Sequence, residues 1–197
     1  MKRLALVFGA CLFATLVAAQ SEKQTVERPD VKVGDAWTYV TMDLLTKIPQ
    51  RESTLEITEV GEATITGKVR SDGKESVARY GPDWSGASDF PIFSFPLEIG
   101  KKWKYRRSYM GSCGDAVDEM EAEVKGWEDI EVPAGKFRAL RVEHNGTFNA
   151  PRCGYGKKHH WFWYVPSVKR FVRYEQGVYG SPAPAGFIQD LASFKLK

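Results

Sequence analysis

Helical periodicity and catalytic signatures are both scarce in this sequence of 197 residues. After residue 30, only Thr41–Ile48 could form a short helix, because no other segment repeats its apolar residues every 3.6 positions. The chain holds no GxSxG, HExxH, P-loop or GxGxxG motif. These absences argue against a helical bundle and against the common hydrolase, protease and nucleotide-binding classes, so we expect no cofactor.

A strong charge of one sign is lacking as well. The chain has 28 Lys and Arg against 25 Asp and Glu, a net charge of +3. Residues 1–19 carry Lys2 and Arg3 and no acid, so the remainder has a net charge of only +1. We therefore expect no nucleic-acid partner, since such partners require a basic surface.

The N-terminus has the layout of a secretory signal peptide. Met1-Lys2-Arg3 precedes an apolar run from Leu4 to Ala19 that ends in small residues, and we expect cleavage after Ala19. This run is too short for a comfortable membrane span, so we expect no transmembrane segment in the mature chain. An alternative interpretation is a lipoprotein with Cys11 as the lipidated residue. The expected organisation is a signal peptide (1–19), a flexible spacer (20–30) and a single β domain (31–197) in the periplasm or outside the cell.

Cysteine is rare, and its count is informative. Removal of Cys11 with the signal peptide leaves Cys113 and Cys153, an even number in an exported chain, which predicts one disulfide. A zinc site completed by His159 and His160 is the competing interpretation. It lacks CxxC or HxxxH spacing, and neighbouring residues on a strand point to opposite faces. We therefore expect no metal.

What the sequence does contain is a series of alternating segments typical of strands. "KWKYRRSYM" from Lys102 alternates aromatic with basic residues, "EMEAEVK" alternates apolar with acidic residues, and "WFWYV" (161–165) is apolar on both faces. "VKVGDAWTYV" and "LEIGKKWKYR" resemble each other, with Gly34 and Gly100 standing 66 positions apart, and we interpret them as two strands that begin in the same way. The sequence predicts an all-β fold: an antiparallel meander of about nine to eleven strands, closed or half-closed into a barrel, with at most a short helix.

The charges in two of these segments predict a specific pairing. Lys102, Lys104 and Arg106 face outward on one strand, and after a turn Glu119, Glu121 and Glu123 face outward on the next. Pairing would form a cross-strand ladder of opposite charges. The same meander places the loops of Cys113 and Cys153 at one end of the sheet. A tight hairpin at Asn145-Gly146 would instead move Cys153 to the other end.

Aromatic residues are the unusual feature of the composition, with six Trp and 13% aromatics. They either fill the core of a barrel or line a concave binding site. Our candidate ligand-binding residues are Trp37, Trp103, Tyr105, Trp161 and Trp163. A pair of carboxylates for glycosidase chemistry could come from four acids in expected loops, Asp83, Asp89, Asp115 and Asp118, but four such acids are ordinary, and we assign no catalytic residue.

Three segments resemble a known group of bacterial exported β domains of unknown function, similar in shape to the lipoprotein carriers of the LolA and LolB type. They are "FPLEIGKKWKY" (95–105), "GWEDIEVPAGKFRALRVE" (126–143) and "WYVPSVKRFVRYE" (163–175). The resemblance covers roughly residues 31–197 and implies a curved antiparallel sheet with an apolar concavity. It implies no catalytic residues, and the long lid helices of true lipoprotein carriers are missing.

The leading hypothesis is an exported, non-enzymatic protein that holds an apolar or amphipathic ligand, such as a lipid, in a concavity of the sheet. A structural or interaction protein of the envelope, with a filled core and a protein partner, is the alternative. A hydrolase acting on polysaccharide or lipid is a third hypothesis.

Overall fold

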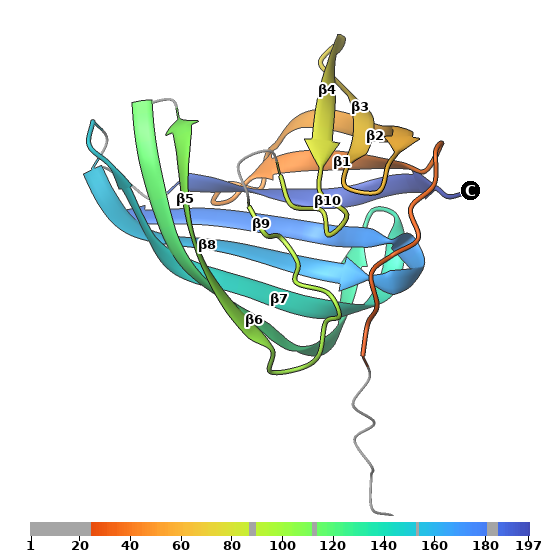
Figure 1. The fold of residues 1–197 in the computed structure, drawn as a ribbon. Helices are drawn as coiled ribbons and strands as arrows, with labels where there is room; N and C mark the ends of the chain where they lie inside the picture. The colour runs from red at the N-terminus through yellow and green to blue at the C-terminus, as the bar shows by residue number, and fades with distance from the viewer. Residues whose placement is uncertain (1–24, 87–89, 112–113, 153, 181–184) are drawn as a thin grey trace, which may run out of the picture.

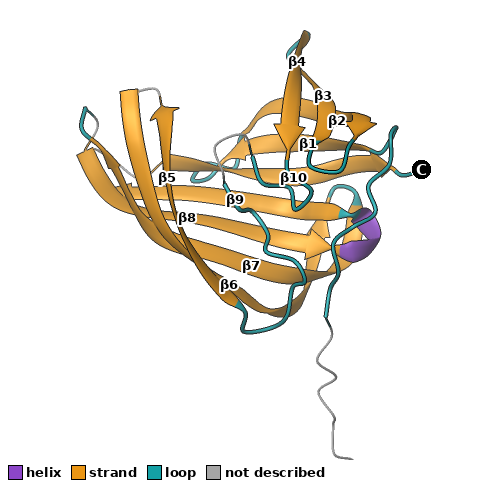
Figure 2. Ribbon diagram, viewed as in Figure 1, coloured by secondary structure: helices purple, strands orange, loops and turns teal. Residues whose placement is uncertain are grey.

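A computed structural model describes residues 25–86, 90–111, 114–152, 154–180 and 185–197. These residues form ten antiparallel strands in one sheet, and in them the only helical element is the 3-10 turn Pro166–Val168 (Figure 2). The all-β class, the antiparallel meander and the expected number of strands are therefore confirmed.

Two consecutive meanders share the sheet. The strands are β1 (Ala36–Asp43), β2 (Pro49–Val60), β3 (Ile65–Ser71), β4 (Lys74–Tyr80), β5 (Lys102–Gly111), β6 (Gly114–Val132), β7 (Gly135–Ala150), β8 (Gly154–Val165), β9 (Arg170–Gly180) and β10 (Ala185–Lys195). Their order is β4-β3-β2-β1-β10-β9-β8-β7-β6-β5, so the pairing of β10 with β1 joins the meanders.

The sheet is curled without being closed, because β4 and β5 at its two ends each pair with a single neighbour (Figure 1). At one end of the strands the β6–β7 turn folds back onto β10, where the backbone N–H of Ala134 donates to the carbonyl of Leu191 at 2.9 Å. We call the other end, where β5, β7 and β9 finish, the mouth. Of the two forms expected, the structure adopts the half-closed one.

The two similar sequence segments begin their strands in the same way. Gly34 and Gly100 have φ angles of 90° and 86°, a left-handed conformation that glycine adopts without a steric penalty. Their N–H groups donate to the next strand, Gly34 to the carbonyl of Ile57 and Gly100 to that of Val124. The repeated phrase is thus a shared turn that starts β1 and β5.

The predicted charge ladder is present on the outer face of the sheet. Lys102, Lys104 and Arg106 of β5 pair in register with Glu123, Glu121 and Glu119 of β6, at 3.6, 3.1 and 3.2 Å between the charged atoms. These side chains are mostly exposed, so each pair contributes little to stability. Their main consequence is to fix which residues of β5 face inward.

The meander around the two cysteines also follows the expectation. Asn145 and Gly146 lie inside β7, paired with His159 and Lys158 of β8, so they form no hairpin. Cys113 and Cys153 themselves lie outside the described residues. Their neighbours meet at the mouth, because a Cβ atom placed on Gly114 would stand 3.7 Å from the Arg152 side chain. The disulfide stays a prediction.

A segment that we call the strap, residues 81–86 and 90–101, crosses the inner face of the curled sheet (Figure 1). Phe93 of the strap packs edge-on against Phe162 and Tyr164 of β8, and Trp84 packs edge-on against Trp37 of β1. The opposite face of β8 carries Trp163, which hydrogen-bonds to Glu128 of β6. The end of β8 is therefore buried on both faces, as its sequence predicts.

Two local expectations differ from the structure. Thr41–Ile48 forms no helix: β1 runs to Asp43, whose carboxylate accepts the N–H groups of Leu45 and Thr46 and holds a turn. In the segment expected to be a spacer, Val26 is buried and pairs with Leu97 through two backbone hydrogen bonds. The chain is thus already docked on the domain at Val26.

Candidate functional site

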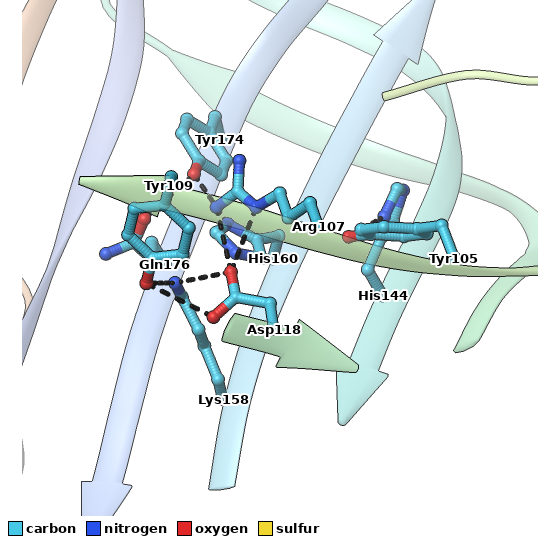
Figure 3. Close-up of polar contacts among 9 residues, drawn as sticks. All are labelled: Tyr105, Arg107, Tyr109, Asp118, His144, Lys158, His160, Tyr174 and Gln176. Atoms are coloured by element: carbon cyan, nitrogen blue, oxygen red, sulfur yellow. Dashed lines mark hydrogen bonds and ion pairs between the residues drawn. The ribbon is translucent and has the colours of Figure 1, made fainter. Parts of the chain in front are cut away.

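A cluster of polar and charged side chains lies on the inner face of the sheet, toward the mouth. Figure 3 shows its contacts. Arg107 of β5 and Asp118 of β6 are directly paired residues, and Lys158 of β8 reaches them past β7. At its position opposite Lys158, β7 has Gly146, which carries no side chain. We call Arg107, Tyr109, Asp118 and Lys158 the cationic cluster.

Every hydrogen-bond partner that the structure gives Asp118 is a donor. One carboxylate oxygen accepts Nε and Nη2 of Arg107 at 3.0 and 2.9 Å and Nζ of Lys158 at 2.8 Å. The other accepts the Tyr109 hydroxyl at 3.2 Å, and that hydroxyl accepts Lys158 Nζ at 3.0 Å. The exposed fractions of the side chains are 0% for Asp118, 5% for Lys158 and 12% for Arg107. Two cations thus share one buried carboxylate.

A pair of histidines continues the polar row on the inner face. His144 of β7 pairs in register with His160 of β8. The Nε2 atom of His144 lies 3.0 Å from the carbonyl of Ile92, which can only accept, so Nε2 carries the proton. Nδ1 is then the acceptor for the Tyr105 hydroxyl at 3.0 Å. Burial lowers the pKa of His144 to about 3, and the imidazole is neutral.

His160 differs from His144 because only one of its nitrogens has a partner. Nδ1 lies 2.7 Å from the Tyr174 hydroxyl, which also reaches the side-chain oxygen of Gln176 at 3.2 Å. Nε2 is buried and has no hydrogen-bond partner among the described residues. Burial, followed by the charges of Lys158 and Arg107, lowers the pKa of His160 well below its usual value. This imidazole is a neutral group with one unused polar atom.

The structure does not bring the five predicted aromatic residues together. Trp37 is fully buried, and its indole N–H donates to the carbonyl of Val168 at 2.8 Å. Trp103 donates to the carbonyl of Pro91 and packs edge-on against His144, on the same inner face as Tyr105. These three side chains support the core and the strap. Their role in ligand binding stays a prediction.

Trp161 and Trp163 lie on the outer face, where Arg141 contacts both rings. The guanidinium of Arg141 lies 4.8 Å from the centre of Trp161 and 5.2 Å from that of Trp163, and His159 stacks on Trp161 at 4.2 Å. Glu143 holds Arg141 at 2.7 Å. Arg141 and His159 therefore cover part of the Trp161 ring.

Sequence reasoning missed the cationic cluster although the signal was present. Asp118 does not lie in a loop, as expected, but in β6. It has the same phase as Met120 and Ala122, which face inward. Likewise, Arg107 follows the outward Arg106, so alternation turns it inward. A charged residue in the apolar phase of a strand was the available clue.

Two cations that share one carboxylate leave a positive charge that a polar or anionic group can approach. No three His, Cys, Asp or Glu side chains of the described ranges are grouped to hold a metal ion. The hydrolase hypothesis requires two carboxylates facing one another, whereas Asp118 is engaged by Arg107 and Lys158.

Comparison with known proteins yields a likeness in fold. No family model matches the chain, and no curated protein matches its sequence. A Bacteroides fragilis protein with a YmcC-like fold, taken to be exported, is similar at a TM-score of 0.55 and 16% identity, covering 87% of this chain and 100% of its own. A Parabacteroides distasonis protein taken to be a lipoprotein gives 0.53 and 14%, with the same coverages. The hypothetical lipoprotein YmcC of Escherichia coli gives 0.50 and 7%, covering 81% and 84%.

The TM-scores show a shared YmcC-like fold. At identities this low, the likeness says nothing about activity. A similarity to the LolA and LolB carriers themselves is not among these findings. Within the part of the chain that the structure describes, no helix has the length and apolar character needed to cross a membrane.

Proposed function

We propose that this is an exported, non-enzymatic binding protein that holds an amphipathic ligand on the inner face of its half-closed sheet. The observation that carries the proposal is the division of that face into two parts. Toward the strap the face is filled by aromatic side chains such as Phe93 and Phe162. Toward the mouth it presents partly exposed aromatic and apolar side chains beside the cationic cluster: Phe148, Tyr174, Val178 and Phe187.

This division suits an amphipathic molecule because it places apolar side chains next to a polar anchor. Concave sites gather aromatic residues around a few polar groups that fix the orientation of the ligand. Export is supported by the N-terminal signal and by the fold shared with proteins taken to be exported or lipoproteins. The absence of a known catalytic signature from the sequence favours binding over turnover.

The test is native mass spectrometry of the protein exported and purified from its own host. We expect a bound amphipathic molecule of defined mass, which organic extraction removes and an added amphiphile restores. Protein that is repeatedly ligand-free and that takes up no amphiphile after extraction would contradict the proposal.

A second candidate function, an interaction protein of the envelope, is favoured by the filled part of the core. Trp37, Trp84 and Phe93 are buried beneath the strap, as this alternative requires. The edge strands β4 and β5 also offer unpaired backbone groups to a partner strand. Crosslinking in cells discriminates between the two, since a stoichiometric protein partner without bound amphiphile would favour the second function.

A further inference from the structure

The formal charges of the cationic cluster do not balance. Arg107 and Lys158 contribute two positive charges and Asp118 one negative charge; Asp118 and Lys158 are buried, and Arg107 is mostly buried. Among the residues that the structure describes, those that flank them on the inner face are uncharged: Met120, Phe148, Gln176 and Val178. The acids of the same strands, such as Glu119 and Glu175, face outward by alternation. A buried positive charge in excess is costly unless a further group compensates it.

Ring contacts compensate only part of this charge. The guanidinium of Arg107 lies 4.3 Å from the centre of the Phe90 ring and 4.8 Å from that of Tyr109. Such contacts stabilise a cation but leave the formal charge in place. Arg107 is also the least buried of the three charged side chains, so it is the member of the cluster that a ligand can reach.

His160 adds an independent observation beside the cluster. Its Nε2 atom is buried without a partner in the described structure, although a buried polar atom normally has one. The Tyr174 hydroxyl donates to the side-chain oxygen of Gln176, so Nδ1 of His160 carries the proton and donates to Tyr174, and Nε2 is an unused acceptor. This neutral imidazole therefore adds no negative charge that would balance the two cations.

We propose that the cationic cluster binds the anionic head of the ligand, a phosphate or a carboxylate. Arg107 contacts the oxyanion, Lys158 supplies a second positive charge behind it, and Asp118 holds the two cations in place. This inference rests on the proposed function for the apolar part of the ligand and names its head group. It assigns the class of anionic amphiphiles in preference to neutral ones.

The experiment compares two neighbouring arginines that point to opposite faces. Arg107→Gln removes the excess charge and leaves Asp118 paired with Lys158, so the variant should fold. Arg106→Gln is the matched control, because Arg106 belongs to the outer ladder and its side chain is 64% exposed. Lys158→Met, which keeps an unbranched apolar side chain, provides a second variant with a neutral cluster.

Isothermal titration of the extracted exported protein uses three probes: monododecyl phosphate, dodecyl maltoside and inorganic phosphate. We expect monododecyl phosphate to bind more tightly than the neutral maltoside. Arg107→Gln and Lys158→Met should each weaken it about 10- to 100-fold, as expected for a lost charged hydrogen bond, while Arg106→Gln leaves it unchanged. Binding of the maltoside should be equal in all four proteins.

The outcomes separate the two proposals. Equal affinity for the two amphiphiles, or unchanged binding of monododecyl phosphate in both cluster variants, would overturn the anionic head group and leave amphiphile binding standing. If neither amphiphile binds, the proposed function fails, and inorganic phosphate decides the inference. If inorganic phosphate binds the native protein but neither cluster variant, the cluster is a site for a free anion. If inorganic phosphate does not bind the native protein either, the anion site is overturned.

Discussion

Mild acid should destabilise this protein through the buried imidazole of His144. The ring is fully buried, both of its nitrogens are used by Ile92 and Tyr105, and burial lowers its pKa from 6.5 to about 3. The unfolded chain takes up a proton as the pH falls below 6.5, whereas the folded chain does not until about pH 3. The contribution of His144 to stability is therefore fully present above the pKa of the unfolded chain, and it is lost as the pH falls toward the pKa of the folded chain.

The expected magnitude follows from the same two values. At pH 5 the solvent is about 1.5 units below the unfolded pKa, and each unit corresponds to about 1.4 kcal/mol, so His144 alone costs about 2 kcal/mol relative to pH 7.5. His160 is shifted in the same direction and adds to the effect. Glu175, whose pKa is lowered mainly by the hydrogen bond from His159, loses its contribution at more acid pH. A window of about pH 5 to 6 therefore isolates the imidazoles.

The assay is urea unfolding followed by tryptophan fluorescence across this window, for the native protein and for His144→Gln. The variant should be less stable at pH 7.5, because Tyr105 loses its acceptor. Its stability should nevertheless fall less steeply with acid, by about 1.4 kcal/mol per pH unit, since one titrating group is gone. Lys157→Gln, an exposed change on β8, is the control and should keep the native slope. Equal slopes in the native protein and His144→Gln would refute the assignment of a neutral buried imidazole.

Three further predictions concern the frame around the site. Arg141→Lys should lower the free energy of unfolding by about 1 kcal/mol, because lysine keeps the charge but has no planar guanidinium to contact the Trp161 and Trp163 rings. A change within error in urea unfolding would contradict this role. Gly146→Ala should lower the free energy of unfolding by more than about 2 kcal/mol, since its Cβ would lie 2.0 Å from the carbonyl oxygen of Glu119. Gly100→Ala meets no atom within 4 Å, and only the positive φ of Gly100 opposes a side chain there. Cys113 and Cys153 should appear as one cross-linked peptide in non-reducing mass mapping of the exported protein, and two labelled thiols would show that the predicted bridge is absent.

The outward and inward faces of the strands could be predicted almost completely from the sequence. Alternation is a local property, because successive side chains of a strand point to opposite sides whatever the rest of the chain does. For the same reason the Gly-x-x-Trp-x-Tyr phrase predicts the shared start of β1 and β5, and the charges predict the ladder between β5 and β6. The helix considered at Thr41–Ile48 was wrong because a single carboxylate, that of Asp43, redirects the backbone there.

The partners across the sheet were decided only by the tertiary structure. Lys158 meets Asp118 because β7 carries a glycine between them, and His144 is held by Ile92 because the strap crosses the inner face. These contacts join residues 40 and 52 positions apart, and they depend on the curl of the whole sheet. Alternation in the sequence is enough to turn Arg107 and Asp118 inward once β5 and β6 are known to include them, although Asp118 was expected in a loop. Only the folded sheet decided that two cations meet a single carboxylate there, since long-range pairing is the sum of many register and packing choices that no local pattern contains.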